Sequence, residues 1–379
     1  MPDSHGPRIE YVDALKGAII IAIVFVHLTM LSGMERGGSA QEMPLVMQAL
    51  YLGLMSYFII SGYFFRPGRG FSENMRRRGT QLVAALLICT LVLPAVLYLW
   101  ATIFGKCPGT DDYVRAMMQC FASQAVFEDI SVPLDSPLSS PTVGYYYLWA
   151  MVGAFVVFYA VADRIRGDLR LEAAAIVILL AVQCLYIEFI HLRLPLYFHV
   201  SPIAAAFMVL GMTLKEKDVL HRIGEFRVRE AGFWGLFLGC LAGAAVLVYL
   251  LHPDVMFDLC YFGAYGGLSV FSYFAEASLM FVVLSYVMLF ITKVPLLHIP
   301  FTEMGRHTLG TMLLHSFIPK MMLIPFFAYA GGIMPSGFGF FPSLAVAFAD
   351  LILCYAVCRF GHGTVSRITG RLRNTSAPE

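Results

Sequence analysis

Long apolar stretches alternate with short polar segments along nearly the whole chain. A helix needs about 18 or more apolar residues to cross a bilayer, and the sequence contains ten such stretches. The pattern therefore predicts an all-α polytopic membrane protein, a bundle of about ten transmembrane helices that forms a single domain over residues 1–379. The predicted spans are residues 16–33, 45–65, 80–104, 143–163, 171–191, 198–214, 231–251, 269–292, 307–329 and 336–358.

The composition agrees with this class. Of the 379 residues, 59% are hydrophobic and 13% are charged, whereas soluble domains carry about 25% charged residues. Residues 1–16 are too polar for a secretory signal, so the first span is expected to stay in place. The eight cysteines form no CxxC cluster, and no nucleic-acid-binding motif is present. We therefore expect neither a bound metal nor a nucleic-acid partner.

The positions of lysine and arginine predict the topology. An even number of spans places both termini on one side, and twenty-one Lys and Arg residues fall in segments on that side. Since cytoplasmic loops retain positive charge, both termini and the tail 359–379 are expected to be cytoplasmic. The 105–142 loop is then outside, where Cys107 and Cys120 could form a disulfide. The four Lys and Arg residues of the outside loops are Arg36, Lys106, Arg115 and Arg193.

The first span carries two ionisable residues at a notable spacing. Lys16 and His27 are eleven residues apart, which on an α-helix is about 16 Å and roughly three turns, so both lie near one face. An imidazole deep in a bilayer is expensive and often functional. A snorkelling lysine and a hydrogen-bonded packing histidine are the structural alternative.

Two later spans also contain ionisable residues at depth. Counting the helical rise from the span ends places Glu276 and His315 at a depth comparable to that of His27. Three such groups at one level predict a shared polar chamber. Asp350 of the last span could neutralise Lys16 or Arg306.

Arginines follow the second span on the predicted cytoplasmic side. Topology and contact with anionic lipid explain some of them. Because guanidinium groups match phosphate geometry, they are also candidates for holding a phosphorylated cytosolic molecule. A second basic cluster, Lys215–Arg229, has the same two interpretations. The donor-site candidates are Arg66, Arg69, Arg76, Arg77 and Arg78.

Together these motifs resemble the acyltransferase-3 family, the integral-membrane O-acyltransferases of bacteria. Asp13, Lys16, Gly17 and His27 match that family's first-span pattern, and YFIISGYFF at 57–65 matches the end of its second span. The basic NMRRRG at 74–79 and the MGRHTLGTMLLHSF at 304–317, which contains His315, match later motifs. The resemblance runs from residue 8 to about 358.

The resemblance implies transfer of an acyl group, usually acetyl, from cytosolic acyl-CoA to a sugar hydroxyl. The acceptor would be a cell-envelope or exported glycan, and the enzyme would reside in the plasma (inner) membrane with the lipid bilayer around it. Acetyl-CoA would be a co-substrate, with no permanently bound cofactor. His27, Glu276 and His315 would be catalytic, His27 as a general base. Lys16 and the five arginines would bind the donor.

Three other readings remain open from the sequence, one of them a membrane acyltransferase of another class, which could modify lipids or small antibiotics and differs only in its acceptor. His27, Glu276 and His315 could form the proton relay of a secondary transporter, although no convincing internal repeat of the kind found in transporters is visible. The chain could also be a non-catalytic scaffold or receptor, which would leave the buried ionisable groups unexplained.

Overall fold

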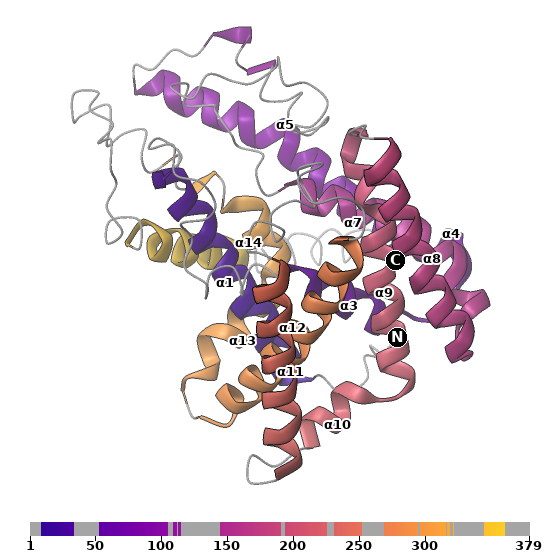
Figure 1. Ribbon diagram of the computed structural model, residues 1–379. Coiled ribbons are helices and arrows are strands. Elements are labelled where there is room, and N and C mark those ends of the chain that lie inside the picture. The colour runs from indigo at the N-terminus through magenta and orange to yellow at the C-terminus, as the bar shows by residue number, and fades with distance from the viewer. Residues whose placement is uncertain are drawn as a thin grey trace, which may run out of the picture.

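A computed structural model describes residues 9–33, 53–104, 109–111, 113–114, 145–190, 194–225, 231–251, 269–294, 296–315, 317–318, 321 and 345–360. Within these ranges the regular structure is entirely helical (Figure 1). Five helices there are long and apolar enough to cross a membrane: Gly70–Ile103, Tyr147–Ile165, Leu169–Phe189, Leu196–Glu216 and Ser269–Thr292. The prediction of an all-α membrane protein is therefore confirmed. The 105–142 loop, apart from a few residues, and both Cys107 and Cys120 lie outside the described ranges.

The described part of the first half of the chain contains long helices separated by short ones. Helix α1 starts at Glu10, six residues before the predicted span, so the polar residues that precede the apolar stretch are helical as well. The second apolar stretch ends in a single 3-10 turn followed by a two-turn helix. The elements are α1 (Glu10–Gly33), η3 (Gly53–Met55), α3 (Ser56–Tyr63), α4 (Gly70–Asn74), the π-helical turn η4 (Met75–Gly79), α5 (Thr80–Ile103), α7 (Tyr145–Ile165) and α8 (Leu169–Phe189).

The described part of the second half contains two long apolar helices, of 21 and 24 residues, and an interruption at His307. The predicted ninth span starts at His307, but the structure places a helix directly before that residue and interrupts the helix at His307, whose φ is −112°. The elements are η6 (Pro195–Val200), α9 (Ser201–Glu216), α10 (Val219–Glu225), α11 (Ala231–Leu251), α12 (Ser269–Thr292), α13 (His298–Arg306), α14 (Thr308–Leu314) and a helical segment over 345–360.

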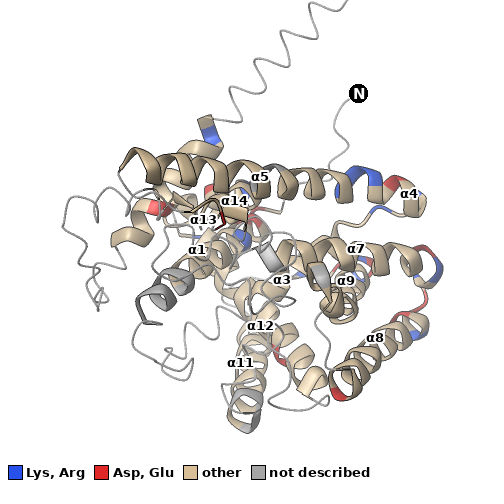
Figure 2. Ribbon diagram, turned by 90° about the horizontal axis from the view of Figure 1, so that it is seen from above, with Lys and Arg blue, Asp and Glu red and all other residues tan. Residues whose placement is uncertain are grey.

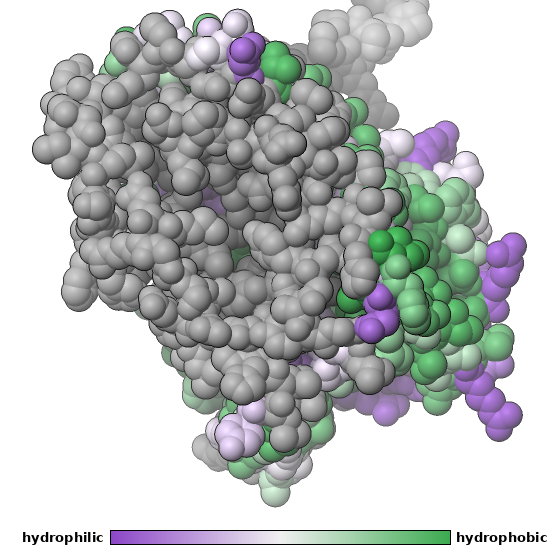
Figure 3. All heavy atoms as spheres, turned by 45° about the horizontal axis from the view of Figure 1, so that its top comes forward, coloured by the Kyte–Doolittle hydropathy of each residue, from purple (hydrophilic) through white to green (hydrophobic). Residues whose placement is uncertain are grey.

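Charged and apolar residues occupy different parts of the surface. Lysine and arginine residues gather near α4 and at the turn between α7 and α8, at one edge of the molecule (Figure 2). Between such polar margins lies a broad apolar surface (right side of Figure 3). Helix α8 contributes exposed apolar side chains, including Val177, Ile178, Leu185 and Phe189. An exposed face of this kind suits contact with lipid.

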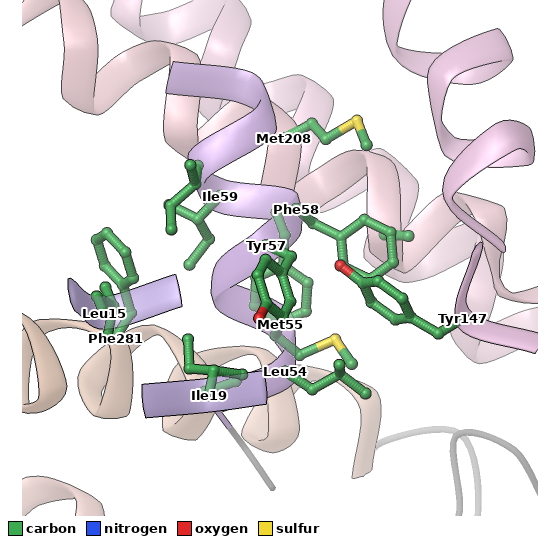
Figure 4. Close-up of a cluster of buried hydrophobic side chains, with 14 of the residues drawn as sticks. Leu15, Ile19, Leu54, Met55, Tyr57, Phe58, Ile59, Tyr147, Met208 and Phe281 are labelled. Atoms are coloured by element: carbon green, nitrogen blue, oxygen red, sulfur yellow. The ribbon is translucent and has the colours of Figure 1, made fainter. Parts of the chain in front are cut away.

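The core lies where helices from distant parts of the chain meet. Leu15 and Ile19 of α1 pack with Phe58 and Ile59 of α3 and with Phe281 of α12 (Figure 4). This buried cluster joins the first, second and eighth apolar stretches.

Glycines allow two pairs of helices to approach backbone to backbone. A Cβ at Gly17 of α1 would lie 1.8 Å from the Phe301 carbonyl oxygen of α13, and a Cβ at Gly305 would lie 1.8 Å from the Asp13 carbonyl oxygen. The same reciprocal arrangement joins α3 and α9. There, Cβ atoms at Gly62 and Gly211 would lie 1.9 Å from the carbonyl oxygens of Met208 and Ile59. These crossings leave no room for any side chain, so they fix the positions of α1 and α3.

Candidate active site

The site is built around α1, which carries both Lys16 and His27. The helix is continuous from Glu10 to Gly33, so the rise of about 16 Å and the shared face follow from its geometry. The His27 backbone is helical, and its side chain lies outside the described part of the structure.

Lys16 is neutralised within its own helix. Its Nζ lies 2.6 Å from Oδ1 of Asp13, an i,i+3 pair in which the Asp13 side chain is 8% exposed and that of Lys16 24%. The suggestion that Asp350 neutralises Lys16 or Arg306 is wrong, since Arg306 pairs with Glu303. Asp350 is buried and its Oδ1 accepts a hydrogen bond from the Cys354 thiol at 3.3 Å.

Three separate motifs meet beside Lys16. The crossing at Gly17 and Gly305 brings the start of α1 against the segment that leads into α14. The hydroxyl of Tyr57 in α3 donates to the Lys16 carbonyl oxygen at 2.7 Å and lies close to the Thr308 side chain, whose own hydroxyl donates to the Gly305 carbonyl oxygen at 2.7 Å. The first-span, second-span and late-chain motifs therefore converge at one point. The site roles of Asp13, Tyr57 and Thr308 were not predicted, although the i,i+3 spacing of Asp13 and Lys16 is visible in the sequence.

Glu276 lies in α12 and is 1% exposed. Its Oε1 has no hydrogen-bond partner among the residues that the structure describes. Helix α12 packs against α1, where Phe281 meets Leu15 (Figure 4). A buried carboxyl group without compensation is costly, and such groups tend to mark functional positions.

His315 follows α14 and is 2% exposed. Its Nδ1 lies 2.8 Å from the Met312 carbonyl oxygen and 3.2 Å from that of Thr311. Because a carbonyl only accepts, Nδ1 must carry the proton, and this anchors the ring and makes Nε2 the basic nitrogen of the neutral form.

Helix α1 is the shared neighbour of these groups, since both α12 and α14 pack against it. Within the described contacts, however, no hydrogen bond or ion pair joins Glu276 to His315. The structure brings their helices to α1 without pairing the two side chains directly.

The predicted arginines divide into two groups because of the π-helical turn η4. Arg78 turns inward and donates to the carbonyl oxygens of Phe64 at 3.0 Å and Ser61 at 3.5 Å. Arg76 is exposed, and Arg77 makes an exposed pair with Glu73 at 3.3 Å. π-helical turns are frequent at functional sites. Arg66 and Arg69 are half-buried in the connection between α3 and α4.

Two further cations join Arg66 and Arg78. Lys215 near the end of α9 donates to the Phe65 carbonyl oxygen at 2.5 Å, and it lies within electrostatic range of Arg66, Arg78 and Arg166. We call Arg66, Arg78, Arg166 and Lys215 the cationic cluster. The sequence pattern predicted Lys215 as part of a basic surface for a phosphorylated molecule, whereas Arg166 was predicted only to lie on the same side of the membrane. Such a cluster is suited to binding anions.

These features define a helical membrane protein with buried ionisable residues in helices that pack against α1 and a cationic cluster at the end of α3. The chain belongs to the acyltransferase-3 family: the family model described as an acyltransferase domain matches residues 9–355, nearly its whole length. No curated protein and no solved structure matches the chain. The protein is therefore a membrane acyltransferase, as the motifs indicated, and nothing found supports the transporter reading.

Proposed function

We propose that this protein is an O-acyltransferase of the bacterial plasma membrane that moves an acetyl group from cytosolic acetyl-CoA to a hydroxyl of a cell-envelope or exported glycan. The observation that carries the proposal is the family match over residues 9–355. The continuous helix that bears Lys16 and His27 supports it further, because that helix extends from the predicted cytoplasmic side toward the middle of the bilayer.

In the proposed reaction, His27 acts as the general base. A hydroxyl is a weak nucleophile until its proton is removed, and a neutral imidazole can take that proton as the oxygen attacks the thioester carbonyl carbon. The new carbon–oxygen bond forms, the carbon–sulfur bond breaks, and the proton passes from the imidazole to the departing thiolate. The products are the acetylated glycan and free CoA.

Glu276 and His315 are assigned supporting roles near this base. A carboxylate can stabilise an imidazolium, and an anchored imidazole can orient a neighbouring polar group. The burial of Glu276 and the backbone hydrogen bonds of His315 support this assignment.

Lys16 and the arginines of 66–78 would hold the donor. The Lys16 side chain is one-quarter exposed although its ammonium pairs with Asp13, and an ammonium has three N–H donors, so it can bind a second partner. Arg66, Arg69 and Arg78 lie near the end of α3, whereas Arg76 and Arg77 contribute from the outer side of the helix.

The test combines a cell and a membrane experiment. Envelope and secreted glycans from cells with and without the gene are compared by mass spectrometry, and membranes are incubated with radiolabelled acetyl-CoA. We expect glycans heavier by acetyl groups only when the gene is present, and label transferred to the same glycans. If the gene changes only solute uptake and no acetylated product forms, the proposal fails in favour of a transporter.

A further inference from the structure

The predicted ninth span, residues 307–329, is interrupted at His315 as well as at His307. Helix α14 ends at Leu314 with His315 as its C-cap, and residues 315 and 317 adopt a turn. Helical backbone returns at residue 318, and the Met321 N–H donates to the Phe317 carbonyl oxygen at 3.0 Å. His315 therefore lies at the junction of an inner and an outer helical segment of one span.

Two prolines of this span each remove a main-chain donor. In an α-helix the N–H of residue i+4 donates to the carbonyl oxygen of residue i, and proline has no N–H. Pro319 stands four positions after His315, and Pro325 stands four positions after Met321. Pro325 lies outside the described residues, and its missing N–H follows from its covalent structure. A carbonyl group that loses its helical donor within a membrane needs another partner.

A side chain from a distant helix provides the donor at Met321. The Nε1–H of Trp100, near the end of α5, donates to the Met321 carbonyl oxygen at 2.8 Å. Trp100 lies near the buried face of α5 that contains Leu97 and Ala101, both 0% exposed, whereas Leu99 beside it is 61% exposed. The indole thus joins α5 to the outer segment of the ninth span.

Tryptophan near the end of a span is also typical of the aromatic belt, where its N–H faces lipid headgroups and water. The N–H of Trp100 is instead directed at the backbone of another helix. A hydrogen bond that replaces a missing main-chain bond fixes a position, which a contact with headgroups does not.

The two segments on either side of His315 are held by different parts of the protein. The inner segment, α14, packs against α1, and a Cβ at Gly310 would clash with the Cys358 sulfur of the last helix. The main-chain N–H and the Nδ1 of His315 bond carbonyl oxygens of this inner segment. The outer segment is joined to α5 through Trp100. Because the helix is interrupted between them, the position of the outer segment depends on that contact.

We propose that Trp100 is a positioning residue for the acyl-transfer reaction. By holding the Met321 carbonyl group, Trp100 fixes the outer segment and thereby the surroundings of the His315 imidazole. The inference rests on the proposed function, in which His315 supports the base. Since Trp100 acts through the outer segment and the predicted donor site lies at the inner end of the helices, loss of its N–H should slow the chemical step without weakening donor binding.

Trp100→Phe keeps an aromatic ring and removes the indole N–H. We expect kcat for acetyl transfer in membranes to fall about tenfold or more, because misplacement by about 1 Å can lower a rate by about 10²-fold. The KM for acetyl-CoA should stay at the parental value. Trp234→Phe is the matched control: Trp234 of α11 is 44% exposed, and the same substitution there should leave kcat unchanged. An unchanged kcat in Trp100→Phe, or a defect confined to KM, would overturn the inference.

Pro325→Ala tests whether the hydrogen bond itself matters. Alanine at this position has an N–H that can donate to the Met321 carbonyl oxygen, so the variant that combines Trp100→Phe with Pro325→Ala should regain most of the parental kcat. The same combination should restore expression if Trp100→Phe alone accumulates poorly. An equal loss with and without Pro325→Ala would assign Trp100 to packing or to the aromatic belt and overturn the inference.

Hydrogen exchange of the purified full-length proteins gives a readout that does not depend on activity. Amides of residues 317–321 should exchange faster in Trp100→Phe and return toward the parental rate when Pro325→Ala is added, while exchange in α1 stays unchanged. Parental exchange of these amides in Trp100→Phe would contradict the inference. If exchange behaves as expected but the parent protein acetylates no glycan, the proposed function fails and the structural role of Trp100 stands.

Discussion

Two helix crossings in this protein share a backbone design but differ in charge. At the first, α1 meets α13 through Gly17 and Gly305; at the second, α3 meets α9 through Gly62 and Gly211. In both, a Cβ would fall within 1.9 Å of a carbonyl oxygen of the facing helix. The cation beside the first crossing is paired with Asp13, whereas the second crossing ends in the cationic cluster, with three guanidinium groups around Lys215.

The difference indicates that the two crossings have different roles. A cation paired within its own helix adds little net field, so the first crossing mainly fixes the position of α1 and of His27 along it. In the cationic cluster Arg166 pairs with Glu216, whereas Lys215 and Arg78 donate to backbone carbonyl oxygens and keep further N–H donors that an anion could accept. The second crossing is therefore the better candidate for recognising a phosphorylated ligand.

The largest effect is expected from filling a crossing. Gly17→Ala places a methyl group on the Phe301 carbonyl, so α1 and α13 must separate, and we expect a loss of about 3 kcal/mol or more in the free energy of unfolding. Thermal unfolding of the detergent-solubilised protein measures it. Gly239→Ala in α11, where nothing lies within 4 Å, should be neutral or slightly stabilising. Equal melting temperatures for both variants would show that the crossing is loose.

Removing the cation at the first crossing should affect use of the donor. Lys16→Ala is expected to raise the KM for acetyl-CoA about tenfold with a smaller change in kcat, because a contact remote from the reacting carbonyl contributes mostly uniform binding. Lys16→Arg keeps the charge and should be milder. Initial rates in membranes decide this, and unchanged donor kinetics in Lys16→Ala would separate Lys16 from the donor path.

Substitutions at Arg76, Arg77 and Arg78 should change the donor KM according to the direction in which each side chain points, not according to its place in the sequence. Arg78→Gln removes a side chain held on the Phe64 carbonyl and should raise the donor KM several-fold. Arg76→Gln and Arg77→Gln should cause smaller changes, since exposed ion pairs contribute little. The same kinetic assay compares the three, and a larger effect at Arg77 than at Arg78 would contradict the division made by the π-helical turn.

The smallest effect is expected at the contact that links the two crossings. Tyr57→Phe loses the hydrogen bond to the Lys16 carbonyl oxygen, and we expect a loss of about 1 kcal/mol in the free energy of unfolding. Thr308→Val in the Tyr57→Phe background should differ in cost from Thr308→Val alone, because the two side chains are neighbours and residues in contact are not additive. Strict additivity in thermal unfolding would place the two groups in separate interactions.

Helices with strong apolar runs could be predicted from the sequence in detail. Helices α11 and α12 have the residue ranges of the predicted stretches. A long apolar segment in lipid must satisfy its own backbone hydrogen bonds, and the α-helix is the structure that does so. The early start of α1 and the break at His307 were missed, since polar residues weaken the hydropathy signal at both places. Local pairs such as Asp13 with Lys16 follow from helical spacing.

Contacts between distant segments could not be predicted in the same way. Tyr57 reaches Lys16 only because α3 lies against α1, and Arg166 reaches Lys215 only because the ends of α7 and α9 meet. Neither contact leaves a periodic signal in the sequence. The sequence likewise predicted the same role for Arg76, Arg77 and Arg78, although in the structure Arg78 points inward from the π-helical turn and its two neighbours point outward.

The central claim is that His27 transfers a proton in the reaction, and His27→Gln tests it most directly. Glutamine can keep a packing hydrogen bond but cannot act as a base at neutral pH, and a positioned base is typically worth about 10²–10⁴-fold in rate. Acetyl transfer and CoA binding are measured on the same purified variant. The account predicts loss of transfer by that factor with CoA affinity and thermal stability close to those of the parent protein. Transfer that stays near the parent rate in His27→Gln would contradict it and make the histidine structural.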